Sequence, residues 1–160
     1  MDIFGQGGAA QPQQVPADFD AENAGNNEEI EKQFAVKAVQ HLETYWKLLS
    51  LRKGSELKLT SMDDAIYLHL CNALPEYTTK EGVSVIDEDK MKSPGGKKLW
   101  REFMMQYEHT VDDYNFGSLL RADVSKGYDE DNSIFVPRMQ FLAIEIVRNR
   151  LGLNDWVCER

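Results

Sequence analysis

Apolar residues recur every three or four positions in four segments of the chain, the spacing of one face of an α-helix. The first segment predicts a long amphipathic helix that begins at Asn26 or Asn27, where a side-chain oxygen can cap free amides, and ends before Gly54. His41 falls at the edge of its apolar face, which favours a packing histidine over a ligand. That face carries Ile30, Phe34, Ala38, Leu42, Tyr45, Trp46 and Leu49.

A second helix is predicted to start after Thr60, which precedes Asp63 at capping spacing, and Pro75 stops it. Its apolar residues spread around nearly the whole circumference, which indicates a helix buried between others. These residues are Met62, Ile66, Leu68, Leu70, Cys71 and Leu74. In residues 83–92 a short strand, an extended loop, and one or two helical turns all fit the pattern.

Two more helices have clear boundary signals. Ser93 and Pro94 form a good helix entry, and the helix that follows carries a large aromatic face and ends near Asp112. The last helix starts near Pro137, is apolar over more than half of its girth, and is closed by Gly152 as a C-terminal cap. We predict that this last helix is the central one.

About twenty residues without clear periodicity separate the last two helices, between Asp113 and Ser133. Loops of this length in compact domains are usually functional or disordered. Apolar anchors at both ends favour an ordered loop with a short antiparallel strand pair: Leu119, Leu120, Ile134, Phe135 and Val136. The predicted fold is therefore all-α, a single compact domain of about five helices over residues 28–152 with at most one minor β pair.

Composition sets the limits of this domain. Residues 1–27 contain no Lys or Arg and are rich in Gln, Gly, Ala, Asn and Pro, so we expect a disordered N-terminal tail. Residues 153–160 are expected to form a C-terminal tail. No long apolar run and no hydrophobic N-terminal segment occurs, which predicts a soluble, non-secreted cytoplasmic protein.

Charge and motif content exclude several classes of function. The net charge of −9 repels phosphate backbones, so we expect no direct nucleic-acid binding. Cys71 and Cys158 are expected to be reduced, and the three histidines lie on different segments, so no zinc site or other cofactor is predicted. Acidic triplets at residues 87–89 and 129–131 have a form that can hold a divalent metal, but solvated turns are the simpler interpretation. The chain is not expected to be an enzyme.

The last helix carries a polar stripe, because Arg138, Glu145 and Asn149 fall within an arc of roughly 40° at about 100° per residue. Two interpretations stay open. The stripe contacts a partner directly, or it is structural, with Glu145 paired to Arg148 or to Arg138.

The irregular loop supplies the other candidate residues. Arg121 follows two apolar anchors, so we predict that its guanidinium is presented to a partner from a fixed base. Asp123 and Tyr128 join it as partner-binding candidates, or serve as anchors for Glu145. Replacing Arg121 by Glu is then expected to impair recognition more than folding.

The segment from Gly117 to Arg150 also carries a family resemblance. It contains, in order, Leu119, Leu120, Arg121, Asp123, Gly127, Tyr128, Asn132, Ile134, Phe135, Pro137, Arg138, Gln140, Ala143, Ile144, Glu145, Arg148, Asn149 and Arg150. This order resembles the small eukaryotic family labelled polysaccharide biosynthesis domain-containing, over roughly residues 28–152. The family is regarded as a dedicated chaperone for newly made elongation factor 1-alpha, the GTPase that delivers aminoacyl-tRNA to the ribosome.

The resemblance implies a monomer that uses no ATP, binds the nascent GTP-binding domain of elongation factor 1-alpha and shields it from aggregation, at or near the translating ribosome. An acidic surface suits a basic partner that handles RNA. Two rival functions remain: a ribosome-associated adaptor without a folding role, and an enzyme of polysaccharide assembly, for which the sequence shows no sugar-nucleotide or metal site.

Overall fold

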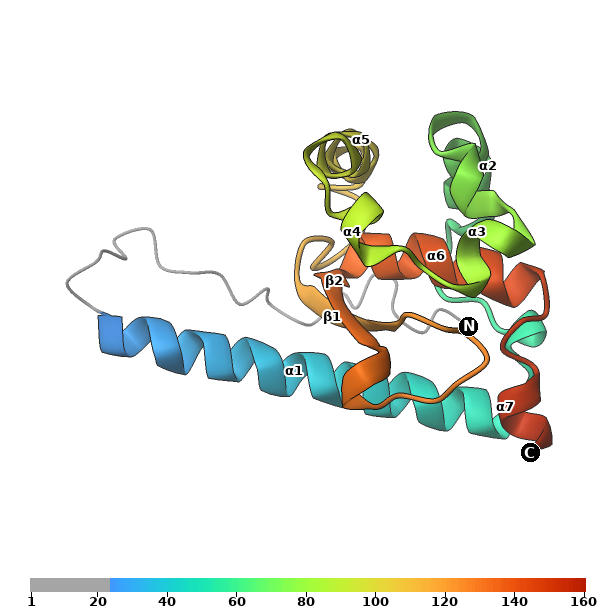
Figure 1. The fold of residues 1–160 in the computed structure, drawn as a ribbon, viewed down its shortest axis with the longest axis horizontal. Helices are drawn as coiled ribbons and strands as arrows, with labels where there is room; N and C mark the ends of the chain where they lie inside the picture. The colour runs from blue at the N-terminus through green and yellow to red at the C-terminus, as the bar shows by residue number, and fades with distance from the viewer. Residues whose placement is uncertain (1–23) are drawn as a thin grey trace.

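Two long helices enclose a β-hairpin in the computed structural model, which describes residues 24–160 (Figure 1). Helix α1 (Ala24–Leu51) lies on one side of the hairpin and α6 (Arg138–Arg150) on the other. The strands β1 (Gly117–Arg121) and β2 (Ser133–Pro137) pair antiparallel. Helix α1 starts slightly before the predicted cap, and most of the predicted tail, residues 1–23, lies outside the described residues.

Helix α1 has the predicted amphipathic character along the part whose side chains are described, from Lys32 onward. Tyr45 and Leu49 are fully buried, and His41 is 8% exposed, as expected for a packing residue. The rings of His41 and Tyr45 lie 5.0 and 5.2 Å from that of Phe141, which joins α1 to α6. The turn after α1 requires glycine, because a Cβ at Gly54 would lie 2.4 Å from the side-chain oxygen of Asn149.

Helix α6 is the central element, as its composition predicted. Every residue from Met139 to Asn149 is buried. Gly152 adopts φ 74°, the left-handed conformation of a helix C-cap that glycine adopts without strain. The amide of Gly152 donates to the carbonyl of Asn149, which closes the last turn.

The remaining long helices are α2 (Asp63–Ala73) and α5 (Pro94–Met105). The predicted cap of α5 is present, because the Ser93 hydroxyl accepts from the amide of Gly96 at 3.1 Å. The N-cap of α2 is Met62, which forms no side-chain cap bond, and the Asp63 carboxylate instead accepts from the amide of Thr60 at 2.7 Å before the helix begins. The predicted burial of α2 on all sides is wrong, because Leu68 is 62% exposed on a face that no other helix covers. Helix α5 ends earlier than predicted, where turns replace the helix up to residue 112.

Short helices and turns connect the long helices and the hairpin. The undecided region around residues 83–92 contains α3 (Lys80–Ser84), α4 (Glu88–Met91) and an isolated β-bridge between Val85 and Asp123. The short 3-10 helices are η2 (Gly54–Glu56), η3 (Pro75–Thr78) and η4 (Glu130–Asn132). Residues 24–160 thus form seven α-helices and one two-stranded sheet, which confirms the predicted helical domain with one minor β pair.

The C-terminal residues pack onto the domain, in contrast to the tail that the sequence suggested for residues 153–160. Asn154 is 0% and Val157 1% exposed, and α7 (Trp156–Glu159) contacts α1. The indole of Trp156 donates to the carbonyl of Val124 at 3.0 Å. No helix in the described part of the chain is long and apolar enough to span a membrane.

Candidate functional site

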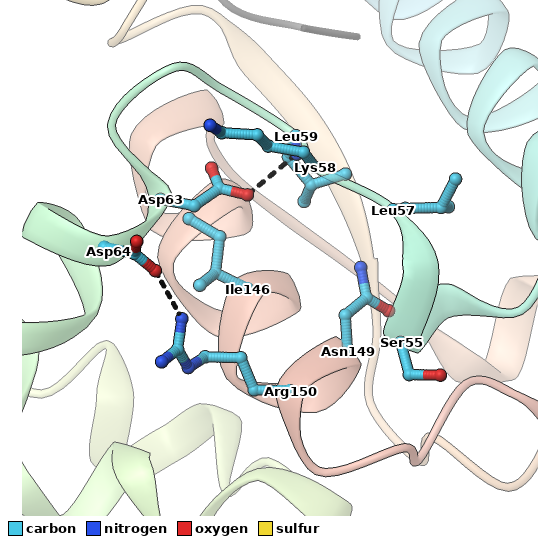
Figure 2. Close-up of a pocket in the computed structure, with 9 residues that line it drawn as sticks. All are labelled: Ser55, Leu57, Lys58, Leu59, Asp63, Asp64, Ile146, Asn149 and Arg150. Carbon is cyan, nitrogen blue, oxygen red and sulfur yellow. Dashed lines mark hydrogen bonds and ion pairs between the residues drawn. The ribbon is translucent and has the colours of Figure 1, made fainter. Parts of the chain in front are cut away.

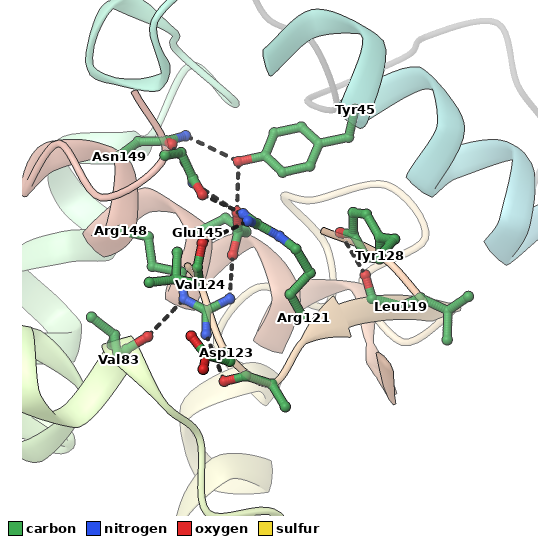
Figure 3. Close-up of polar contacts among 12 residues, drawn as sticks. Tyr45, Val83, Leu119, Arg121, Asp123, Val124, Tyr128, Glu145, Arg148 and Asn149 are labelled. Carbon is green, nitrogen blue, oxygen red and sulfur yellow. Dashed lines mark hydrogen bonds and ion pairs between the residues drawn. The ribbon is translucent and has the colours of Figure 1, made fainter. Parts of the chain in front are cut away.

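A buried polar cluster occupies the junction of α1, α6, the hairpin and the C-terminal segment (Figure 3). We call it the Glu145 cluster, after the carboxylate at its centre. None of its members is more than 4% exposed, although all of them are polar or charged apart from the ring of Tyr45. The members are Tyr45, Arg121, Glu145, Arg148, Asn149 and Asn154.

Both oxygens of the Glu145 carboxylate are hydrogen-bonded. Oε2 accepts from Arg148 at 2.9 Å, and Oε1 accepts from the Tyr45 hydroxyl at 2.8 Å and from the Asn154 amide at 3.0 Å. The guanidinium of Arg121 lies 3.7 Å from Oε1. A buried carboxylate is tolerated only with partners of this kind.

The two guanidiniums bind the loops that surround the cluster. Arg121 donates to the carbonyls of Val124 at 2.9 Å and Lys126 at 3.2 Å, and also to the side chain of Asn154. Arg148 donates to the carbonyls of Val83 at 2.8 Å and Ala122 at 3.3 Å. The two positive charges exceed the one negative charge, and backbone carbonyls supply the remaining acceptors. The cluster therefore fixes the irregular loop and α3 to α6.

Titration behaviour follows from this arrangement. Burial alone would raise the pKa of Glu145, but Arg148 and Arg121, with the hydroxyl of Tyr45, hold it below its ordinary value. Burial, and then the charge of Glu145, raise the pKa of Tyr45 well above 10. Glu145 is thus ionised and Tyr45 protonated at neutral pH, the states that their hydrogen bond requires.

Aromatic side chains cover the cluster on its outer side. The Arg121 guanidinium lies 5.4 Å from the ring of Trp46 and 5.7 Å from that of Tyr128, distances typical of cation–π contacts. The indole of Trp156 lies 6.1 Å from Trp46, edge to face. All three rings are partly exposed, so they form the boundary between the buried charges and solvent.

The predicted exposure of Arg121 is wrong, because its side chain is fully buried. The physical reason is that the hairpin is covered on both faces. Leu120 faces the core beneath α6, and Arg121, the next residue, faces α1 and meets Trp46. Of the two interpretations of the polar stripe, pairing of Glu145 with Arg148 is confirmed.

Asp123 and Tyr128 shape the loop. The Asp123 carboxylate accepts from the hydroxyl of Ser125 at 2.7 Å and from its amide at 2.9 Å, and these bonds lower the pKa of Asp123. The Tyr128 hydroxyl donates to the carbonyl of Leu119 at 3.0 Å. Burial is the main reason that the pKa of Tyr128 is raised. Tyr128 therefore ties the loop to β1, and Asp123 fixes the turn at Ser125 within the loop.

Arg138 lies apart from the other candidates, so the predicted stripe is divided. Its guanidinium is 3.5 Å from the carboxylate of Asp113, a residue in the left-handed region at φ 57°. The alternative pairing of Arg138 with Glu145 does not occur. Instead, burial and the nearby charge of Arg138 lower the pKa of His41 to about 3.

Sequence reasoning missed the roles of Tyr45, Trp46 and Asn154. Tyr45 and Trp46 follow the apolar periodicity of α1. Nothing else in the sequence indicated that the Tyr45 hydroxyl bonds Glu145 or that Trp46 forms a cation–π contact with Arg121. Asn154 lies in the short segment after the last long helix, for which the sequence predicted a tail. Its partners Arg121 and Glu145 are distant in the sequence, and no local pattern marks them.

A pocket of about 240 Å³ adjoins the cluster between α2, η2 and α6 (Figure 2). Asn149 lines it, so one cluster member reaches this surface. Three of the charged side chains that line the pocket are engaged within the protein: Arg150 bonds Asp64 at 2.9 Å, and Asp63 accepts from backbone amides. Within residues 24–160, no group of three or more His, Cys, Asp or Glu could hold a metal ion.

Comparison with known proteins places this geometry in a family. The family model described as PBDC1 protein matches residues 30–159. The Schizosaccharomyces pombe protein PBDC1 homolog is 59% identical over 139 residues, covering 87% of this chain and 95% of the relative. The Saccharomyces cerevisiae homolog is 50% identical over 139 residues, with the same coverage of 87% and 95%.

A solved structure agrees with the fold. The solution NMR structure of protein yst0336 from Saccharomyces cerevisiae is 48% identical in sequence, with a TM-score of 0.80 over 91% of this chain and 99% of that one. The matched regions include α1, the hairpin, α6 and the C-terminal segment, the elements that build the Glu145 cluster. The chain therefore belongs to the PBDC1 family, the polysaccharide biosynthesis domain-containing family that its residues 117–150 resemble.

Proposed function

We propose that this protein is an ATP-independent chaperone that binds the newly made GTP-binding domain of elongation factor 1-alpha in the cytoplasm. The proposal starts from the family and from the function that the family resemblance implies. It also holds that the protein is no enzyme, needs no cofactor and acts as a monomer.

One structural observation supports a binding role in particular. The polar side chains of the Glu145 cluster are buried and hold the helices and the hairpin together. Nine large apolar side chains of the described residues are exposed. Exposed apolar side chains are available to contact apolar groups of another polypeptide chain. The net charge of −9 favours basic partners.

The position of the Glu145 cluster refines the role of the candidate residues. Arg121, Glu145 and Asn149 are buried, so their contribution to partner binding is to hold the loop of residues 122–132 in one conformation. Asp123, Tyr128 and Arg138 are partly exposed, so a partner can contact them directly.

Crosslinking in a translating extract tests the proposal. The protein is added with a photoreactive group on an exposed position, and captured chains are identified by mass spectrometry. We expect nascent elongation factor 1-alpha, caught once its GTP-binding domain is partly made, and no enrichment of unrelated nascent GTPases. Equal capture of empty ribosomes would favour the adaptor function. Heat from titration with sugar nucleotides and divalent metals would favour the enzyme.

A direct folding assay completes the test. Denatured GTP-binding domain is diluted into buffer without ATP, and light scattering measures aggregation. An equimolar amount of this protein should suppress scattering, and an equal amount of an unrelated acidic protein should not. Scattering that is unchanged by this protein would contradict a chaperone role.

A further inference from the structure

The pairing of the hairpin determines which backbone groups point away from it. The amide of Arg138 donates to the carbonyl of Phe116, and the amide of Ala122 donates to that of Asn132. Hydrogen-bonded pairs alternate with non-bonded pairs along an antiparallel ladder. Leu119 and Phe135 therefore form a non-bonded pair, and the N–H and C=O of Phe135 point away from β1.

The two edges of the sheet differ in how they are covered. On the β1 side, the carbonyl of Leu119 accepts from Tyr128, and the chain beyond β1 pairs with residues 84–86. On the β2 side, no hydrogen bond within residues 24–160 involves the outward N–H or C=O of Phe135. Phe135 is also 50% exposed. The outer edge of β2, formed by Ser133 and Phe135, is thus open in the described structure.

The side chain of Phe135 leaves this edge accessible. Its ring lies across β1 against Gly117, where an added Cβ would come within 2.1 Å of the ring. An aromatic residue placed over a cross-strand glycine stabilises the pair and leans away from its own outer edge. The ring therefore presents an apolar surface beside the free backbone groups of Phe135.

A fixed acidic turn adjoins the start of β2. Asp129, Glu130 and Asp131 are exposed, and none of them forms an ion pair within residues 24–160. The carbonyl of Asp129 accepts from the hydroxyl of Ser133 at 2.7 Å, which holds the turn against the strand. Three unpaired carboxylates thus lie next to one end of an open strand edge.

We infer that the outer edge of β2 binds an extended, basic segment of the client polypeptide by strand addition. The incoming strand would bond to the free N–H and C=O groups of Ser133 and Phe135, pack an apolar side chain on the Phe135 ring, and place Lys or Arg beside residues 129–131. Backbone pairing requires a chain whose own N–H and C=O groups are free, which an unfolded or newly made segment provides. The inference rests on the proposed function and specifies how the client is held.

Charge decides between the possible occupants of the edge. A second copy of this chain would bring the same acidic turn and a net charge of −9, so like charges would oppose pairing of two β2 edges. An extended basic segment instead gains attraction at the acidic turn. We therefore assign the edge to a basic partner segment and treat self-association as a result that would overturn the inference.

Overlapping peptides from the GTP-binding domain of elongation factor 1-alpha provide the probe. Binding of wild-type protein and of Phe135→Pro is measured on a peptide array and by fluorescence anisotropy. Proline removes the outward N–H of residue 135, which the β1–β2 ladder does not use. We expect basic peptides with an apolar residue to bind the wild type, and Phe135→Pro to lose at least tenfold in affinity.

Three further variants separate the components. Phe135→Ala keeps the N–H and removes the ring, so its loss should be smaller than that of Phe135→Pro. Asp129→Lys with Asp131→Lys should weaken binding of basic peptides and make it less sensitive to salt. Leu68→Lys changes an exposed apolar residue on α2, away from the hairpin, and should leave binding unchanged. Amide NMR spectra establish that each variant keeps the hairpin. If Phe135→Pro loses it, Ser133→Pro removes the other outward N–H of the β2 edge and takes its place, with the same expected loss of affinity.

The outcomes of these experiments distinguish a failure of strand addition from a failure of the proposed function. If the wild type captures the nascent domain and a folded Phe135→Pro does so equally well, the edge is not the binding site and only this inference fails. The same holds if no linear peptide binds, or if the edge instead pairs two copies in a sedimentation experiment. If the wild type captures no elongation factor 1-alpha at all, the proposed function fails first.

Discussion

Replacing Arg121 by Glu should greatly lower the free energy of unfolding of the domain. The change removes the guanidinium that bonds Val124, Lys126 and Asn154, and it places a second carboxylate beside Glu145, where the present separation from Arg121 is 3.7 Å. Removing one partner of a buried ion pair costs about 3 to 5 kcal/mol. The new like-charge contact makes the upper end of this range the expected value. This reverses the expectation from sequence, in which the substitution spared folding.

Urea denaturation followed by circular dichroism measures this free energy. For a domain of this size, about 5 kcal/mol corresponds to a fall in melting temperature on the order of 10 to 20 °C. Lys126→Glu is the matched control, because Lys126 is exposed in the same loop and donates no side-chain bond; its cost should stay under ~0.5 kcal/mol. Arg121→Lys should fall between the two, since it keeps the charge and loses the planar fork.

A double-mutant cycle with Glu145→Gln tests the cause. If Arg121 and Glu145 act in one cluster, the two substitutions should couple by more than ~1 kcal/mol. A melting temperature of Arg121→Glu within two or three degrees of the wild type would refute the stabilising role of Arg121 in the Glu145 cluster. It would instead favour Arg121 as a surface residue that contacts a partner.

The other predictions concern pH, the C-terminal segment and the N-terminal residues. The folded pKa of His41 is about 3, below its ordinary value of 6.5, so the unfolded state alone takes up this proton between these values. The free energy of unfolding should therefore fall as pH decreases from 6.5, by up to ~1.4 kcal/mol per pH unit, and urea titrations from pH 7 to 4 should show a shallower fall for His41→Gln. Deleting residues 153–160 should lower the melting temperature by several degrees or more, because the deletion removes the buried side chains of Asn154 and Val157. Deleting residues 1–23, whose composition cannot form a core, should shift the melting temperature by no more than a few degrees.

Local signals were sufficient for most of the framework. Capping residues such as Ser93 located helix starts, Gly152 marked the end of α6, and periodicity identified α6 as the buried helix. The i,i+3 pairing of Glu145 with Arg148 was also accessible from the sequence, because both residues lie on one helix.

Features that depend on distant neighbours were not accessible. Leu68 lies on the opposite face of α2 from the buried Ile66 and Leu70, and only the folded arrangement shows that this face is exposed. Arg121 is buried because α1 covers the second face of the hairpin, and nothing near residue 121 reports the position of α1. Asn154 lies in a short segment without helical periodicity, and only contacts formed in the folded chain, such as the one with Arg121, distinguish it from a tail residue.

The Glu145 cluster has a consequence for how this protein itself is made. Tyr45 bonds Glu145 across 100 residues of sequence, and Ser55 bonds Asp155 across the same separation. Contacts of such long range form slowly, since the intervening chain must be brought together first. Helix α1 is synthesised early, yet its buried face gains its full set of partners only when the hairpin, α6 and Asn154 have been added. The domain can therefore fold only after residues 138–154 have been synthesised, with part of the apolar face of α1 uncovered until then.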